Sequence, residues 1–400
     1  MKKLVLISVL FALFAGALYA QELRFDGYIN SGLGVINAAD DDTVVKPFGV
    51  DSESNGYRFR LSGSYTNEAK NAGARFRLQS QRRIDQAGYF SIPYVYGWAG
   101  FFDSKITITG GIVDDGTWTT ADWWWNDDQG EGLGLLLKIT PVEGLSFGAG
   151  AFTISQQSGG SNNILTLGGN LPNFGNILIK AEDAKYTFNA AYTIKDAFRL
   201  GVSFRTKNQA GWAPYNADPP ANYPYNGREE TSQLIGEFRL LAVKDLTAVI
   251  VGVFDKLDDF SDSGNITLSE TFSYKINSEI NAGLDMVQFL YNRPVDVDPG
   301  LLFHLWGSYS IGSIVPRVDL TYFIGGRSNT SQQYHRRGYA AAAENYSVFG
   351  VRPSVRINLD SRTFVEIGDL INLDFDKNNG YAGEDSQLTN IFYIDVKWSF

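Results

Sequence analysis

The last ten residues of the chain constrain its fold more than any other segment. In the run Ile391–Phe400, every second residue from Phe392 is apolar, and Tyr, Asp, Lys and Ser stand between them. Strict alternation with a period of two predicts a β-strand with one apolar face and one face in contact with water. A strand of this length also suffices to cross a bilayer at a tilt. The apolar residues of the segment are Phe392, Ile394, Val396, Trp398 and Phe400.

A terminal strand that ends on an aromatic residue resembles the closing strand of bacterial outer-membrane β-barrels. In that family, the C-terminal pattern is the signal that the barrel-assembly machinery reads. The resemblance therefore implies this machinery as a partner, with the five apolar residues named above as the signal.

The first twenty residues have the organisation of a secretory signal peptide. Met1-Lys-Lys is charged, Leu4–Ala17 is apolar, and the sequence turns polar at Gln21. The apolar stretch is too short for a transmembrane helix. We expect cleavage after Ala20, with Ala17 as the alternative, and export through the periplasm. Residues 1–20 would then be the signal peptide, and residues 21–400 one barrel domain.

Composition agrees with a membrane barrel and excludes several other classes. The chain has 27 Phe, 21 Tyr, 8 Trp and 42 Gly, which suits a barrel with aromatic interfaces and many turns. No run approaches the ~20 apolar residues that a membrane helix needs. There is no Cys, so there is no disulfide. The net charge of −10 argues against nucleic acid as a partner.

Alternating segments recur along the whole chain, and we count about eighteen, an even number as bacterial single-chain barrels require. Sixteen is the alternative if two weak segments fuse. The predicted strands are 23–36, 56–66, 73–81, 89–102, 105–113, 131–140, 145–155, 177–194, 197–207, 232–243, 246–256, 265–276, 280–291, 301–311, 314–324, 346–359, 363–372 and 390–400.

The connections between these segments alternate between long and short. Long ones span 37–55, 114–130, 156–176, 208–231, 325–345 and 373–389, whereas the turns between them are tight. Outer-membrane barrels sort their connections in this way, with long loops outside and short turns in the periplasm. The sequence therefore predicts an all-β fold, a transmembrane antiparallel up-and-down barrel.

Alternation also assigns side chains to the two faces of the wall. In 57–65 and 74–81, apolar residues alternate with Arg, Ser and Gln. An Arg on the lipid face near the midplane costs about 2–4 kcal/mol, so we expect the arginines inside. Like charges this close favour a hydrated interior. The inward arginines would be Arg58, Arg60, Arg75 and Arg77.

An interior with both signs of charge on many strands resembles that of porins. The resemblance implies outer-membrane lipid as surroundings, small hydrophilic solutes as partners, and a homotrimer. In porins the third outward loop folds into the barrel and forms a constriction, where its acidic residues face arginines. Here the corresponding acids would be Asp114, Asp115, Asp122, Asp127, Asp128 and Glu131.

The same loop carries four tryptophans, for which two interpretations stand open. They could form an aromatic surface that stacks against sugar rings, as in sugar-specific porins. They could equally pack the loop against the inner wall or belong to the outer aromatic girdle, which we favour. The four residues are Trp118, Trp123, Trp124 and Trp125.

We expect a passive diffusion channel with no catalytic residue, metal or cofactor. His304, between Phe303 and Leu305, should point inward, and a catalytic role for it is disfavoured. Asp40–Asp42 is better explained as an exposed acidic loop than as a Ca²⁺ site. The alternative functions are a sugar- or anion-selective porin and a surface adhesin that displays long loops.

Overall fold

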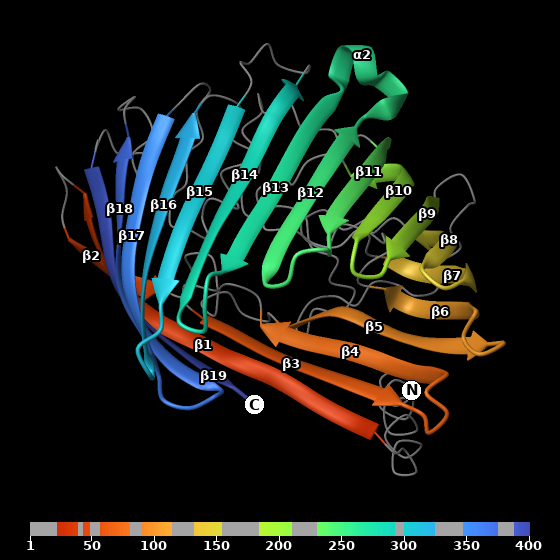
Figure 1. Cartoon of the computed structure of the whole chain (residues 1–400), viewed down its shortest axis with the longest axis horizontal. Helices are drawn as coiled ribbons and strands as arrows, with labels where there is room; N and C mark the ends of the chain where they lie inside the picture. The colour runs from red at the N-terminus through yellow and green to blue at the C-terminus, as the bar shows by residue number, and fades with distance from the viewer. Residues whose placement is uncertain are drawn as a thin grey trace.

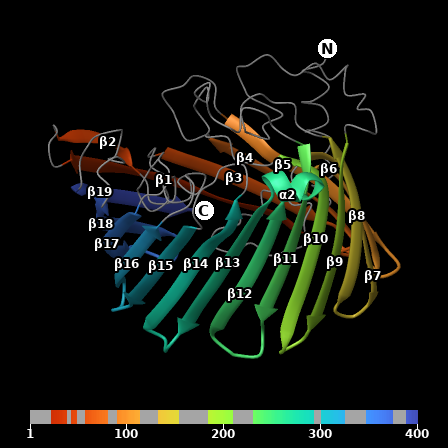
Figure 2. The same ribbon diagram turned by 90° about the horizontal axis from the view of Figure 1, so that it is seen from above.

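The described part of the chain forms one antiparallel β-sheet that closes on itself into a barrel (Figure 1 and Figure 2). The computed structural model describes residues 22–38, 43–48, 57–80, 90–113, 132–153, 184–209, 230–292, 300–324, 347–374 and 388–400.

Eighteen strands make the wall, which confirms the predicted number. They are β1 (Glu22–Ala38), β3 (Tyr57–Thr66), β4 (Ala72–Ser80), β5 (Phe90–Phe101), β6 (Ile106–Val113), β7 (Gly132–Val142), β8 (Leu145–Thr153), β9 (Ala184–Ile194), β10 (Phe198–Gln209), β11 (Glu230–Leu240), β12 (Leu246–Asp255), β13 (Asn265–Lys275), β14 (Ile280–Asn292), β15 (Gly300–Tyr309), β16 (Ile314–Ile324), β17 (Ser347–Asn358), β18 (Thr363–Asp374) and β19 (Leu388–Ser399).

Each strand pairs with its neighbours in sequence, and the first and last strands close the ring. One edge of β1 pairs with β19, from Tyr28 opposite Ser399 to Ala38 opposite Thr389. Its other edge pairs with β3 over Glu22–Ser31. Because neither end strand is left with an open edge along the wall, the barrel satisfies its backbone hydrogen bonds internally, as a membrane-spanning sheet must.

One short strand was not predicted. β2 (Val44–Phe48) lies within the first long connection and pairs with the upper part of β1, from Gly32 to Ile36. β3 covers only Glu22–Ser31 of β1, so the edge of β1 beyond Ser31 is left for β2. The strand is short and contains Pro47, which suits an edge position because proline cannot donate to a ladder.

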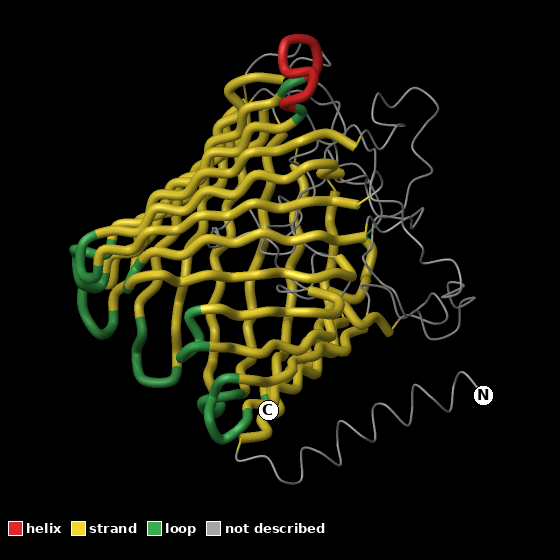
Figure 3. The backbone as a smooth tube through the Cα atoms, turned by 90° about the vertical axis from the view of Figure 1, so that its right-hand side faces the viewer, coloured by secondary structure: helices red, strands yellow, loops and turns green. Residues whose placement is uncertain are grey.

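The short turns gather at one end of the barrel (Figure 3). They join β3 to β4, β5 to β6, and each later pair through β17 to β18, which confirms the predicted alternation. In the last of them, Asp360 accepts hydrogen bonds from the backbone N–H groups of Arg362 at 2.6 Å and Thr363 at 2.8 Å. The bond from Arg362 lowers the pKa of the Asp360 carboxyl.

At the opposite end, a small helical connection joins β12 to β13 (Figure 3). It consists of η4 (Leu257–Asp259) and α2 (Phe260–Ser263). Among the described residues, neither this connection nor any other helix has the length and apolar character to cross a membrane.

The outer face of the wall is largely apolar. Leu135 is 61% exposed, Leu33 58% and Phe188 53%, and such side chains recur on strands all around the barrel. Apolar exposure on this scale is unusual for a protein in water and matches the lipid-facing band of a membrane barrel. The C-terminal strand contributes Phe392, Ile394 and Trp398 to this face, as predicted from their alternation.

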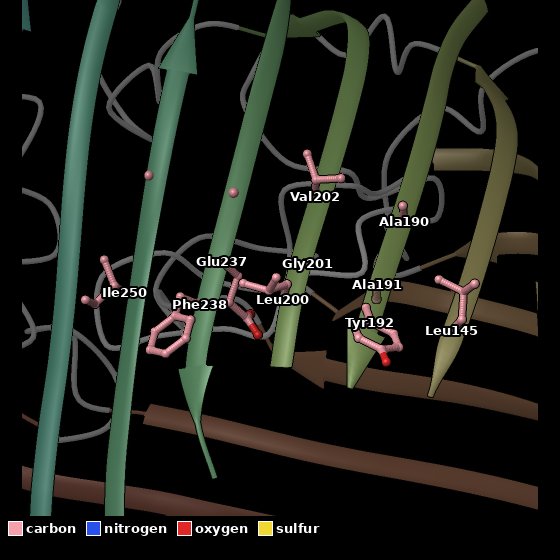
Figure 4. Close-up of a pocket in the computed structure, with 12 residues that line it drawn as sticks. Leu145, Ala190, Ala191, Tyr192, Leu200, Gly201, Val202, Glu237, Phe238 and Ile250 are labelled. Carbon is pink, nitrogen blue, oxygen red and sulfur yellow. The ribbon is translucent and has the colours of Figure 1, made fainter. Parts of the chain in front are cut away.

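A shallow hollow marks the outer face across β9 to β12 (Figure 4). Small residues contribute to the hollow, since Gly236 pairs with Gly252, and Val202 lies between Gly236 and Ala190. Larger apolar side chains border the hollow, namely Tyr192, Leu200, Phe238 and Ile250.

A charge placed on the outer face tests this assignment of the two faces. Leu137, in the middle of β7, faces outward, whereas the next residue, Lys138, faces inward. Leu137→Arg should lower the free energy of unfolding by about 2–4 kcal/mol, because the guanidinium would meet hydrocarbon. Urea titration of the protein folded in lipid vesicles measures this change.

Lys138→Arg is the control, since it keeps one positive charge on the inner face. It should change the free energy of unfolding by less than about 0.5 kcal/mol. If both variants lowered the free energy of unfolding equally, the assignment of the faces would be contradicted.

Candidate functional site

A chain of ionic contacts crosses the inner wall from β14 to β17, and His304 on β15 stands at its centre. His304 Nδ1 lies 2.8 Å from Asp285 Oδ2, and its Nε2 lies 2.7 Å from Asp319 Oδ1. Carboxylates only accept hydrogen bonds, so both contacts are hydrogen bonds when the ring carries both protons. The side chain points inward, as predicted, and both ring nitrogens are engaged.

Asp319 on β16 is the carboxylate that connects these ionic contacts. It accepts hydrogen bonds from Arg317 Nε at 2.9 Å and from Arg352 on the neighbouring strand, also at 2.9 Å. The Asp319 side chain is only 2% exposed. A carboxylate buried this deeply needs paired, hydrogen-bonded cations, and the two guanidinium groups supply them, with the imidazole as a further contact.

The ionic contacts continue toward the seam where the barrel closes. Arg356 NH2 donates to Glu366 Oε2 at 2.8 Å, and the Tyr393 hydroxyl donates to Glu366 Oε1 at 3.0 Å. Across the seam itself, Asn30 Nδ2 donates to Asp395 Oδ2 at 2.8 Å. The predicted mixture of charges is therefore present on this side of the barrel, and its opposite charges pair with one another.

The arginines of β3 and β4 stand in a different environment. Arg60 Nε donates to Gln79 at 3.3 Å, and Arg77 Nε contacts Ser62 Oγ at 3.5 Å. Arg75 is exposed, and the other two are half-buried. By strand order, this part of the wall lies across the barrel from β13. The structure thus brings together three of the four predicted arginines.

The remaining predicted residues of the constriction lie outside what the structure describes. The backbone of Arg58 pairs with Asn30, but its side chain is not among those described. The third outward loop, with the six acids and four tryptophans named above, lies wholly outside the described residues. Its position and its contact with the arginines remain predictions.

Two patches of the inner wall are apolar, which the alternation argument did not anticipate. Ile235, Val249, Val251 and Val253 form one buried cluster on β11 and β12. A second joins Val113, Leu136 and Phe152 on β6 to β8. The sequence did carry a signal for the first, because 248–254 is apolar on both faces, as strands covered on both sides are.

Sequence reasoning also missed an aromatic row on the inner face of β5. Tyr94, Tyr96 and Trp98 occupy alternate positions beside β4, with Tyr96 opposite Arg75 and Tyr94 opposite Arg77. Their spacing of two residues was visible in the sequence as a single aromatic face. The opposite face of this strand, with Val95, is apolar too, so alternation alone does not tell which face points inward.

Comparison with known proteins identifies the fold. No protein-family model matches the chain, and no curated protein does. Among solved structures, OccK2 (OpdF) of Pseudomonas aeruginosa, solved in complex with glucuronate, is 12% identical with a TM-score of 0.55, over 96% of this chain and 99% of that one. OccK11 (OpdR) of the same organism is 8% identical with a TM-score of 0.53, over 96% and 97%.

A variant of OccD1 (OprD) is 12% identical with a TM-score of 0.50, over 96% of each chain. These proteins are porins, and the likeness shows that this chain has the closed barrel fold of bacterial outer-membrane porins.

Substitution of Asp319 tests whether its carboxylate stabilises these ionic contacts. Asp319→Ala leaves buried Arg352 and His304 without their shared carboxylate, so the free energy of unfolding should fall by about 3–5 kcal/mol. Urea titration in vesicles measures it.

Arg317→Ala is the matched control, because Arg317 binds the same carboxylate from a side chain that is 29% exposed. A partly exposed pair should contribute about 1 kcal/mol or less. A loss of that size in Asp319→Ala as well would mean that the network adds nothing beyond ordinary surface ion pairs.

Proposed function

We propose that this protein is an outer-membrane porin, a water-filled channel through which small hydrophilic solutes and ions diffuse passively. The single observation that carries the proposal is the division of the closed wall into two faces. The outer face is apolar, whereas the inner face carries Arg, Asp, Glu and His on strand after strand. Charged groups lining the inside of a wide barrel favour water and ions there.

The third outward loop, 114–131, is proposed to narrow this channel. Its six acidic residues would face Arg58, Arg60, Arg75 and Arg77 across the constriction, as the resemblance to porins implies. The two apolar patches on the inner wall support an inward-folded segment, because buried apolar side chains need a cover. The tryptophans of the loop are suited to such a role.

A preference for anions is the second candidate function, favoured by the distribution of charge on the wall. Arg317, Arg352 and Arg356 bind carboxylates at 2.7–2.9 Å. Arg77, in contrast, contacts a serine hydroxyl and an aromatic ring among the described residues. The β3–β4 wall should therefore present positive charge to the channel. OccK2, with the same fold, was solved with the anion glucuronate.

The remaining roles follow from the resemblance. Residues 1–20 would direct export through the periplasm. The barrel-assembly machinery would recognise the C-terminal strand, whose apolar positions include Val396 and Phe400. A surface adhesin is the competing function. Ion conduction separates the two.

Single-channel recording in a planar bilayer tests the porin and its selectivity together. We expect large ohmic currents in KCl, with a reversal potential in a salt gradient that favours chloride. The triple variant Arg60→Gln, Arg75→Gln, Arg77→Gln should move the reversal potential toward that of potassium, because three cationic groups leave the wall.

The outcomes separate the two proposals. Folded protein that gives no current would rule out a porin. Current that is unchanged in selectivity after the triple substitution would leave a porin but reject the arginine wall as its anion filter.

We further propose a homotrimer, supported by one polar pair on the lipid-facing wall. Glu270 pairs with Ile250 and Met286 on the outer face, is 8% exposed, and accepts a hydrogen bond from Gln288 at 2.7 Å. Its second carboxylate oxygen has no hydrogen-bond partner among the described residues. A carboxylate is costly against hydrocarbon, so protein contact is favoured there.

Native mass spectrometry in detergent measures the assembly. The unaltered protein should show the mass of three chains, and Glu270→Arg should give single chains, because the contact would acquire an unpaired charge of the other sign. Phe25→Ala, on the outer face of β1, should remain trimeric. A monomeric mass for the unaltered protein would reject the trimer.

A further inference from the structure

Phe400, which follows β19, meets β1 at the seam where the barrel closes. The two strands lie side by side there (Figure 1). The N–H of Phe400 donates to the Gly27 C=O at 3.0 Å, and the Gly27 N–H donates to the Phe400 C=O at the same distance. Phe400 and Gly27 are therefore a directly opposed pair of the antiparallel ladder.

The ring of Phe400 occupies the place that a side chain at residue 27 would take. A Cβ on Gly27 would lie 2.7 Å from Phe400 Cζ and 2.9 Å from Cε2, closer than packed carbon atoms come. Gly27 is buried although it stands on the outer face, whereas Phe25 and Ile29 on either side of it are 46% and 44% exposed. The ring therefore covers Gly27, and the missing side chain makes room for it.

Strand alternation does not decide the register at the seam. A shift by two residues keeps each side chain on its own face of the wall. Two contacts on the inner face tolerate one such shift, because both run diagonally. Lys397 Nζ lies 4.5 Å from the centroid of the Tyr28 ring, although its direct partner is Asn30. Asn30 donates to Asp395 at 2.8 Å, although Asp395 is paired with Gly32. The shift would place the partners of both contacts directly opposite one another.

The outer face distinguishes the two registers. In the observed one, Phe400 covers Gly27, and Trp398 pairs with Ile29, which sets an aromatic residue beside a β-branched one. In the shifted one, Trp398 would come opposite Gly27, and Phe400 would come opposite Phe25. The two registers therefore differ in which ring lies over the glycine.

The surroundings of Phe25 disfavour the shifted register. The Phe25 ring lies 6.4 Å from that of Phe76 at an angle of 69°, an edge-to-face contact. Phe76 in turn covers Gly63, which is paired with Phe25. A ring brought opposite Phe25 would meet an aromatic contact that is already complete, whereas Gly27 has no side chain of its own.

We propose that Gly27 is a seat for the Phe400 ring and that this contact selects the register in which the barrel closes. The seat takes an aromatic side chain of the same chain, which packs on backbone that no Cβ shields. It concerns closure of the wall, so it goes beyond the proposed channel and stands whether or not the channel conducts.

Engineered disulfides report the register of the folded barrel, because the chain has no cysteine of its own. Ser31→Cys with Val396→Cys joins a pair that is opposed in the observed register. Ser31→Cys with Ile394→Cys joins residues that are opposed only after the shift. In the observed register these two are diagonal neighbours, about 7–8 Å apart and too far to bridge. The chain is folded from urea into vesicles of dilauroylphosphatidylcholine, oxidised, boiled and run on a non-reducing gel.

Phe400→Ala removes the ring and keeps the backbone pair. Trp398 is then the nearest ring for the seat, so the yield of the shifted disulfide should rise about threefold to fivefold, as the loss of one cross-strand aromatic contact predicts. Phe392→Ala is the matched control, because Phe392 lies on the same face of β19, is 43% exposed against 46% for Phe400, and is paired with Val35. It should leave the yield unchanged.

Phe25→Gly creates a second seat and keeps both rings of β19. In the shifted register, Phe400 would cover residue 25 and Trp398 would cover Gly27, so the yield of the shifted disulfide should rise in this variant too. Gly27 itself is left unchanged, because a Cβ there would also overlap the carbonyl oxygen of Arg60 on β3.

Each result supports or overturns the seat. A rise in Phe400→Ala and Phe25→Gly, with none in Phe392→Ala, supports it. An unchanged yield in Phe400→Ala overturns it, and so does an equal rise in Phe392→Ala. If Phe400→Ala does not fold, Phe25→Gly alone decides. The vesicles hold no assembly machinery, so loss of the assembly signal cannot produce these results, and failure of the porin proposal is read separately from conduction.

Discussion

The structure depends on one constraint, that a sheet in hydrocarbon cannot leave backbone N–H and C=O groups without partners. The pairing of β1 with β19 meets this constraint by removing the two open edges that a sheet of this size would otherwise have. Once the ring is closed, the two faces of every strand are decided. One face meets lipid and the other the interior, so a residue's position in the alternation determines its surroundings.

The interior is not uniform, and the difference between its two sides follows from how charge is compensated. From β14 to β19, acidic and basic side chains of neighbouring strands pair with one another, and Asp319 contacts two guanidinium groups and the imidazole of His304. On β4, Arg77 contacts the ring of Tyr94 and the hydroxyl of Ser62. This difference between the two sides is the basis for the proposed preference of the channel for anions.

Much of this could be read from the residues. The alternation in 390–400 and in 57–65 gave the strands and the side that each residue faces, because the pleat has a period of two and arginine is excluded from lipid. The same rule placed Arg60, Arg75 and Arg77 on one patch of wall. It did not reveal β2, since five residues containing a proline form a strand only when a longer partner, here β1, offers an uncovered edge.

The sequence by itself determined the order of the strands and the inward direction of His304, because these depend on local periodicity and on the lengths of turns. It predicted about eighteen strands and left sixteen open. Only the tertiary structure decided which side chains meet. Asp285, His304 and Asp319 lie on three strands, and their contacts depend on the register between neighbours, which alternation leaves open by two residues at a time. The same holds for Trp98 over Gly73, where a missing side chain on one strand makes the site for a ring on the next.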